Sequence, residues 1–138
     1  MGDQDSTQVV KQAYEAFQRG DLQALLDSMS DDVVWETPVI TATTYGGRRE
    51  GKEGVAGFFT ELLAAEDLLL FETQEFIAQG NRVAVLGLYR GRVRSTGGVA
   101  ESAFVQIFTV QDGKITNFLE IYDTKSAERA YQRAASAS

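Results

Sequence analysis

Apolar residues recur in the first half of the chain with the spacing of helices that each bury one stripe. Residues 6–19 and a run from Lys52 onward carry apolar side chains three and four positions apart, as an amphipathic helix requires. Gly20 is suited to end the first helix, and Asp21 can cap a second one. The predicted stripes are Val10, Ala13, Tyr14 and Phe17, then Leu22, Leu25, Leu26 and Met29, then Val55, Phe58, Phe59, Leu62 and Leu63.

Other segments show the pattern of strands. Residues 33–37 form a short apolar run that stops at Pro38, which cannot donate to a sheet ladder. Residues 69–79 and 82–94 predict two further strands joined by a turn. Between them and the first strand, residues 38–51 have turn chemistry and no steady period, so we expect a loop over the surface or over a pocket mouth.

The stretch from Gly98 to Thr124 predicts two long antiparallel strands joined by a tight turn at Asp112-Gly113. Strand side chains alternate between faces, so each strand places one polar residue between two aromatic ones. The two sets are Phe104, Gln106 and Phe108 on one strand and Phe118, Glu120 and Tyr122 on the other. A carboxylate is costly to bury between rings, so this face is either solvated or a pocket with a polar centre.

The order of elements is helix, helix, strand, helix, four antiparallel strands and a helical tail at residues 124–138, which Asp123 can cap. This order predicts an α+β fold in which helices cover one face of a curved sheet. At 138 residues the chain has the length of one domain, and we expect residues 1–138 to form a single one.

The amino-acid composition excludes several kinds of catalytic and metal site. The chain has no cysteine and no histidine, which excludes disulfides, thiolate or histidine-bound metals, cysteine nucleophiles and serine-histidine triads. Any acid or base is therefore Asp, Glu, Tyr or Lys. We expect no metal and no cofactor, since Asp31-Asp32 is better explained as an acidic turn.

Charge and hydropathy bear on partners and location. The net charge of −7 argues against a nucleic-acid partner, and the arginines at positions 90, 92 and 94 fit a solvated outer strand face better than an anion site. No run of about 18 apolar residues exists and residues 1–8 lack the features of a signal peptide. We therefore expect no membrane partner and a cytoplasmic protein.

A resemblance to a known family is carried by this order of elements together with VVKQAYEAFQRGDLQALLDSMSDDVVWETP, YGGRREGKEGVAGFF and FVQIFTVQDGKITNFLEIYDT. Over roughly residues 8–125 the chain resembles the nuclear transport factor 2-like superfamily, in its SnoaL-like and ketosteroid-isomerase-related branch. The resemblance implies a cone-shaped, cystatin-like roll, with a bent antiparallel sheet and three N-terminal-half helices around an apolar pocket. It also implies a hydrophobic small-molecule ligand and a homodimer formed through the open face of the sheet, compatible with Leu86 and Leu88.

The catalytic residues of the steroid isomerase are not present at the matching positions of this chain. Its catalytic aspartate falls on Thr37 and its helix-1 tyrosine on Ala13, one residue before Tyr14. Its oxyanion-stabilising acid falls around residues 104–106, where no carboxylate stands. Steroid isomerisation by that mechanism is therefore disfavoured.

The polyketide-cyclase branch fits better, because its members place a catalytic acid/base on the final strand. That position is Glu120 here, with Gln106 as a polar partner that orients substrate or stabilises an enolate. Burial beside Phe118 and Tyr122 would raise the pKa of Glu120 toward neutrality. Glu36 is the other candidate, but it alternates to the face opposite Trp35 and Thr37.

Two functions stay open. The first is an isomerase, cyclase or hydratase that transfers a proton on a hydrophobic carbonyl compound through Glu120; the second is a non-catalytic member that binds an apolar ligand or a partner protein. For several aromatic residues, ordinary core packing is the alternative to ligand contact. The expected substrate contacts are Tyr14, Trp35, Thr37, Tyr45, Phe59, Tyr89, Phe104, Gln106, Phe108, Phe118 and Tyr122.

Overall fold

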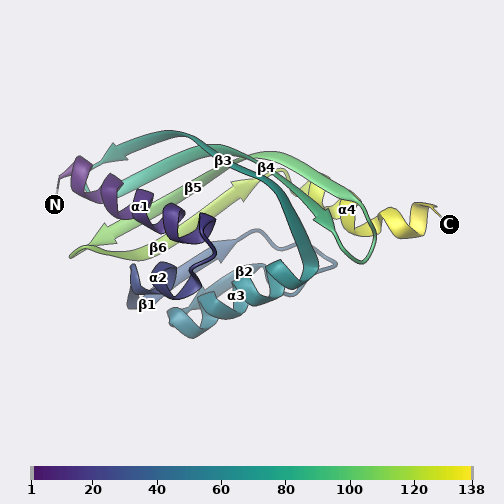
Figure 1. The fold of residues 1–138 in the computed structure, drawn as a ribbon, viewed down its shortest axis with the longest axis horizontal. Coiled ribbons are helices and arrows are strands. Elements are labelled where there is room, and N and C mark those ends of the chain that lie inside the picture. The colour runs from purple at the N-terminus through teal and green to yellow at the C-terminus, as the bar shows by residue number, and fades with distance from the viewer. Residues whose placement is uncertain (1, 138) are drawn as a thin grey trace.

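The computed structural model describes residues 2–137 as helices packed on one six-stranded sheet with strand order β2-β1-β6-β5-β4-β3 (Figure 1). This confirms the predicted α+β class. The elements are α1 (Asp3–Gln18), α2 (Leu22–Asp27), β1 (Met29–Thr37), β2 (Gly47–Glu50), α3 (Gly51–Ala65), β3 (Glu66–Gln79), β4 (Arg82–Val93), β5 (Val99–Gln111), β6 (Lys114–Tyr122) and α4 (Thr124–Ala137).

The predicted helices form, with one correction at the end of the second. Gly20 adopts a φ of 75° after α1, and the Asp21 carboxylate accepts a hydrogen bond from the Ala24 backbone N–H at 3.0 Å, which caps α2. Met29 was expected on the stripe of α2 but begins β1 instead. The backbone N–H of Ile115 bonds to the carbonyl of Ser28 at 2.9 Å, so pairing with β6 replaces the next helical turn.

The edge of the sheet at β1 differs from a simple meander. Strand β1 pairs with β6 in parallel, whereas the other neighbours are antiparallel. The prediction of a loop for residues 38–51 was wrong for Gly47–Glu50, which form β2 and pair Arg49 with Trp35. The exposure of these four residues alternates as in a strand, but none of them has an apolar side chain, so the pattern gave no strand signal.

The hairpin of β5 and β6 forms as predicted. Asp112 and Gly113 have φ values of 51° and 77°, the positive angles that a two-residue turn of matching twist needs. The turn pairs Gln111 with Lys114, and a register shift between Thr109 and Val110 then sets Gln106 directly opposite Glu120, with an aromatic pair on each side along the strands. The prediction that these side chains share one face is confirmed.

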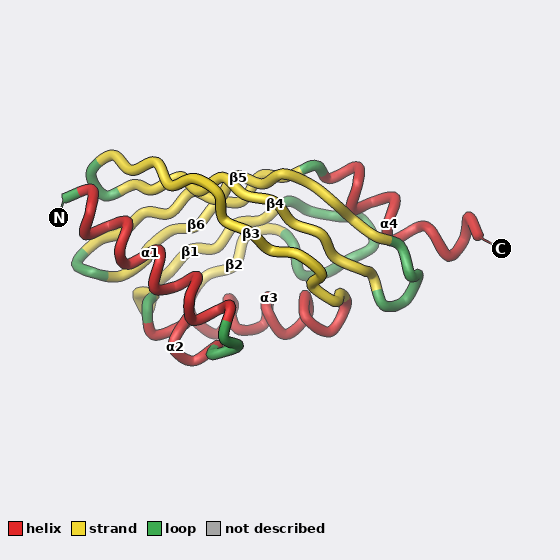
Figure 2. The backbone as a smooth tube through the Cα atoms, turned by 45° about the horizontal axis from the view of Figure 1, so that its top comes forward, coloured by secondary structure: helices red, strands yellow, loops and turns green. Residues whose placement is uncertain are grey.

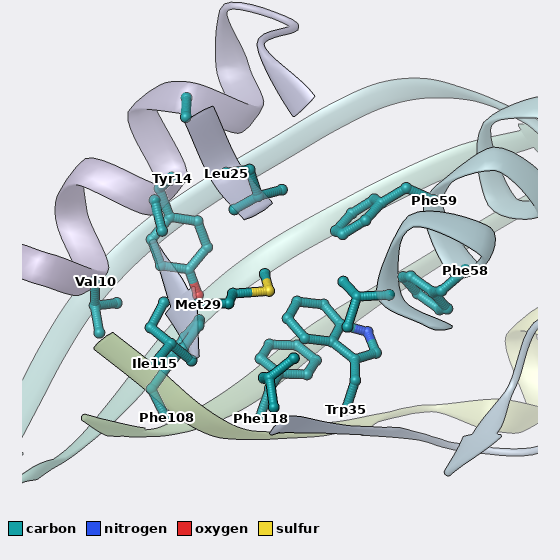
Figure 3. Packing of buried hydrophobic residues seen from close by; sticks show 14 of the residues in the cluster. Val10, Tyr14, Leu25, Met29, Trp35, Phe58, Phe59, Phe108, Ile115 and Phe118 are labelled. Carbon is teal, nitrogen blue, oxygen red and sulfur yellow. The ribbon is translucent and has the colours of Figure 1, made fainter. Parts of the chain in front are cut away.

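The sheet is strongly curved, and α1, α2 and α3 lie on its concave side (Figures 1 and 2). Their buried stripes meet the inward faces of β1, β4, β5 and β6 in one aromatic-rich core, part of which Figure 3 shows. A smaller cluster under α4 packs Ala127 and Ala130 against Ile40, Val93 and Ala100. Within residues 2–137, no helix combines the length and apolar composition needed to cross a membrane.

Candidate functional site

A cavity of about 110 Å³ lies between the concave face of the sheet and the helices, several times the space that one water molecule occupies. Its wall is mostly aromatic and aliphatic. All twelve residues that the sequence analysis named as catalytic or substrate-binding line it. Their roles toward a substrate stay predictions, but the structure brings every one of them to the same cavity.

Glu120 stands at the end of a chain of hydrogen bonds inside this cavity. The amide nitrogen of Gln106 donates to Glu120 Oε2 at 2.6 Å, and the hydroxyl of Tyr14 donates to Gln106 Oε1 at 2.5 Å. Gln106 is 5% exposed and Tyr14 is 8% exposed. The chain therefore links α1, β5 and β6 through two buried side chains and the half-buried carboxylate of Glu120, and it fixes the amide orientation of Gln106.

Burial raises the pKa of the Glu120 carboxyl to about 7, and the charge of Glu66 adds to the rise, while the hydrogen bond from Gln106 opposes it. A carboxyl with this pKa both accepts and returns a proton near neutral pH. Burial and the charge of Glu120 raise the pKa of Tyr14 as well. Tyr14 thus stays a protonated hydrogen-bond donor.

Glu36, the alternative acid, lies on the other side of the sheet. Its side chain is 46% exposed and forms an ion pair with Arg48 at 3.6 Å. The neighbouring side chains of Trp35 and Thr37 point into the cavity wall. Strand alternation thus separates Glu36 from the cavity, as the sequence indicated.

A second carboxylate, which the sequence analysis did not identify, also lines the cavity. Glu66 is only 4% exposed, and three tyrosine hydroxyls donate to it: Tyr45 to Oε2 at 2.8 Å, Tyr131 to Oε2 at 2.6 Å, and Tyr89 to Oε1. Burial, together with the nearby Glu66, raises the pKa of all three tyrosines, so they remain donors. Three hydroxyls on two oxygens satisfy a buried carboxylate.

Local sequence held no signal for this cluster. Glu66 follows two alanines and precedes Asp67 at the junction of α3 and β3, a position typical of solvent-exposed acids. Tyr131 belongs to the predicted helical tail, for which the sequence indicated no contact with the cavity. The substrate contacts expected of Tyr45 and Tyr89 stay a prediction, and in the structure the hydroxyls of both donate to Glu66.

Two further polar atoms of the cavity residues lack a partner. Among the described residues, Trp35 Nε1 and Thr37 Oγ1 are buried without a hydrogen bond. Both are able to donate a hydrogen bond, and a buried donor left unpaired is costly. A ligand oxygen in this part of the cavity would remove that cost.

The charge of the wall restricts what the cavity can hold. Among the described wall residues two are carboxylates and none is Lys or Arg. An anionic ligand would therefore find no positively charged partner. Flat apolar groups, in contrast, meet extended aromatic surfaces, such as Trp35 stacked on Phe118 at 3.7 Å between ring centroids. Across residues 2–137 no group of three acidic side chains is placed to hold a metal ion.

Comparison with known proteins agrees with this architecture. The family model for the SnoaL-like domain matches residues 10–118. An uncharacterised protein of Mycobacterium tuberculosis is 28% identical over 131 residues, which cover 95% of this chain and 98% of the relative.

Solved structures with the same fold include an NTF2-like protein from Burkholderia xenovorans, with a TM-score of 0.86 and 33% identity over 95% of this chain and 98% of that one. Another is TerC co-crystallised with polyporic acid, with a TM-score of 0.84 and 27% identity over 93% of this chain and 98% of that one. The expected NTF2-like roll is thereby confirmed.

Proposed function

This chain belongs to the SnoaL-like domain family, and we propose that it is an enzyme that transfers a proton on a hydrophobic, carbonyl-containing small molecule. The observation that carries the proposal is Glu120, a carboxyl with a pKa of about 7 in the wall of an apolar cavity. A base whose pKa lies near the working pH combines a large ionised fraction with strong proton affinity.

In the proposed reaction the Glu120 carboxylate removes a proton from the carbon next to the substrate carbonyl, and the C–H electron pair moves into an enolate. The resulting carboxylic acid then returns the proton to another carbon, which is isomerisation. In a cyclase the enolate carbon attacks a second carbonyl carbon of the same molecule, the C=O π electrons move onto that oxygen, and the Glu120 carboxylic acid protonates it. In a dehydration the acid protonates the β-hydroxyl group, whose C–O bond breaks to release water as the enolate electrons form the C=C bond.

The developing enolate oxygen needs hydrogen-bond donors. One N–H of the Gln106 amide is committed to Glu120, and the other remains for a ligand. Trp35 Nε1–H and Thr37 Oγ1–H are two unpartnered donors on residues of the cavity wall, and small movements of the side chains that cover them would open them to a substrate oxygen. These donors support an enolate mechanism without any metal ion in the reaction scheme.

The residues that line the cavity indicate the class of substrate. Aromatic residues favour a flat, apolar molecule, and the two carboxylates disfavour an anionic one. That TerC, a protein of the same fold, was crystallised with polyporic acid supports a small-molecule ligand for this cavity as well.

Binding without turnover is the second candidate, because an apolar cavity of this kind holds a ligand whether or not Glu120 reacts. Hydrogen–deuterium exchange separates the two functions without knowledge of the natural substrate. The probe is 2-tetralone, a flat ketone with acidic hydrogens, and ¹H NMR in D₂O follows its loss of signal.

We expect the wild-type protein to accelerate exchange and Glu120→Gln to lose about 100-fold or more of that acceleration, the lower range for a general base. Glu36→Gln is the matched control, since it removes a carboxylate on the outer face. Exchange by a folded Glu120→Gln variant at the wild-type rate would leave only the binding function.

We also propose that two copies of the chain pair through the outer face of the sheet. Adjacent outward positions on β4, β5 and β6 bring Leu86, Val105 and Ile121 into one row. Ile121 is 52% exposed and Leu88 is 37% exposed. Apolar side chains gathered on one exposed sheet face support an interface.

A further inference from the structure

The Glu66 cluster, defined as Glu66 with Tyr45, Tyr89 and Tyr131, draws on four separate segments. Tyr45 precedes β2, Glu66 begins β3, Tyr89 lies on β4 and Tyr131 on α4. Glu66, Tyr45 and Tyr89 form part of the cavity wall. The cluster is therefore placed to touch a ligand and is more than a clamp between distant segments.

Space for the cluster depends on Gly91. A Cβ at Gly91 would overlap the hydroxyl of Tyr89 and the Oε1 oxygen of Glu66. The backbone of β4 thus leaves room where these two polar groups meet. Glu66 Oε1 is also the carboxylate oxygen with fewer donors, since Tyr89 donates to it while Tyr45 and Tyr131 both donate to Oε2.

The Glu66 cluster has more hydrogen-bond acceptor positions than donor hydrogens. Each tyrosine has a single hydroxyl hydrogen, and all three hydroxyls lie within hydrogen-bond distance of the carboxylate. The hydroxyl oxygens of Tyr45 and Tyr131 are also 3.0 Å apart, so these two hydrogens are shared between Glu66 and the tyrosine pair. An ionised carboxylate accepts about four hydrogen bonds, so one acceptor position is left on Glu66. The tyrosine oxygens also retain lone pairs. The cluster can accept a hydrogen bond from a ligand, but it has no hydrogen left to donate.

The cluster and Glu120 occupy different positions along the cavity. Gln106 faces Glu120 across the β5–β6 ladder, whereas Tyr89 faces Ser102, four residues away from Gln106 along β5. The aromatic pair of Phe104 and Tyr122 lies between these two positions. A ligand that reached both polar positions would have an apolar body between its two polar ends.

From this geometry we propose that the Glu66 cluster is a second ligand-binding site, which selects substrates carrying a hydroxyl or amino group at the end opposite the reacting carbonyl. The inference rests on the proposed function for the position of the carbonyl. It adds a requirement that Glu120 does not impose, because the donor group binds through Glu66. The charge of Glu66 also contributes to the raised pKa of Glu120, as expected when both carboxylates face one cavity.

The test compares three ketones that differ at one position: 6-hydroxy-2-tetralone, 6-methoxy-2-tetralone and unsubstituted 2-tetralone. Binding is followed by NMR through the indole N–H signal of Trp35, the single tryptophan and a residue of the cavity wall. We expect the hydroxy compound to bind about tenfold more tightly than either of the others, which corresponds to one additional hydrogen bond to a charged group.

Variants assign that preference to Glu66. Glu66→Gln should remove most of the preference, because it removes the negative charge and replaces one of the two acceptor oxygens by an NH₂ group that only donates, while the remaining oxygen is taken up by the tyrosine hydroxyls. Tyr131→Phe should keep or increase it, because it frees a second acceptor position on the carboxylate. A merely structural cluster would lose the preference in both variants or in neither.

Glu120→Gln separates this inference from the proposed function. It should abolish proton exchange and leave the preference for the hydroxy compound intact. Equal binding of the three ketones to the wild-type protein would overturn the inference, as would a preference that Glu120→Gln removes and Glu66→Gln keeps.

A measurement on the wild-type protein covers the case in which Glu66→Gln does not fold. We expect nuclear Overhauser contacts between the Tyr89 ring and the hydrogens beside the hydroxyl of 6-hydroxy-2-tetralone. If those hydrogens instead contact Phe108 and Phe118 alone, the donor group lies away from Glu66 and the inference is wrong.

Discussion

Gln106 and Glu120 lie directly opposite each other on β5 and β6, and the Gln106 amide nitrogen is 2.6 Å from a Glu120 carboxylate oxygen. This contact stabilises the charged form of Glu120 against the desolvation that favours its neutral form. The balance between the two leaves the pKa near 7. Gln106 therefore limits the rise in the pKa of Glu120, and Glu120 in turn helps to fix the orientation of the Gln106 amide.

Replacing Gln106 by Leu should raise the pKa of Glu120 above 7, because the only hydrogen bond that opposes the rise is lost. The change also leaves the buried Tyr14 hydroxyl without its acceptor, which should lower the free energy of unfolding by about 1–3 kcal/mol. ¹³C NMR titration of the Glu120 carboxyl measures the first effect and urea unfolding the second. Gln74→Leu, at an exposed site on β3, is the control. An unchanged pKa in Gln106→Leu would contradict the role given to this bond.

Stability should fall as the pH rises from about 5 to about 7. The Glu120 carboxyl has a pKa of about 7 in the folded chain against an ordinary value of 4.5, so the folded state holds the extra proton in this interval. Raising the pH removes that proton from a buried group, and the free energy of unfolding then decreases by up to about 3 kcal/mol. Urea unfolding at a series of pH values measures the slope. Glu120→Gln should show a flatter dependence, and an equally steep one would assign the slope to other groups.

Glu66→Gln should lower the pKa of Glu120, because it removes a negative charge that disfavours ionisation of the second carboxyl. The same substitution at Glu36 should leave that pKa unchanged, since Glu36 lies on the outer face and is paired with Arg48. Carboxyl ¹³C titrations of the two variants give the comparison. If the pKa of Glu120 is the same in Glu66→Gln and Glu36→Gln, the charge of Glu66 has no effect on the ionisation of Glu120.

Ile121→Asp should convert a dimer into a monomer without loss of the fold. The substitution puts a charge in the middle of the apolar outer face, where an interface would have to desolvate it. Light scattering coupled to size-exclusion chromatography measures the mass. Val39→Asp is the control, because Val39 is 72% exposed but lies in the loop between β1 and β2. A wild-type protein that runs as a monomer would refute the dimer directly.

The prediction of the site was most successful where it rested on strand alternation. Alternation alone placed Glu120 with Phe118 and Tyr122 and set Glu36 on the other face. The pairing of Gln106 with Glu120 depends in addition on a register shift between Thr109 and Val110, which the sequence pattern does not show. The sequence predicted a loop where Gly47–Glu50 form a strand, and it predicted a helical position for Met29, which begins β1. In both places pairing with another strand outweighs the local preference.

The sequence by itself determined the order of the elements, the position of the hairpin turn and the side of the strand on which each residue lies, because these follow from backbone geometry over a few neighbouring residues. Only the tertiary structure decided that Glu66 is buried, that Tyr45, Tyr89 and Tyr131 converge on it, and that β1 runs parallel to β6. Those contacts join residues up to 86 positions apart, between Tyr45 and Tyr131. No local pattern encodes them, since they exist only once the curved sheet has closed around its cavity.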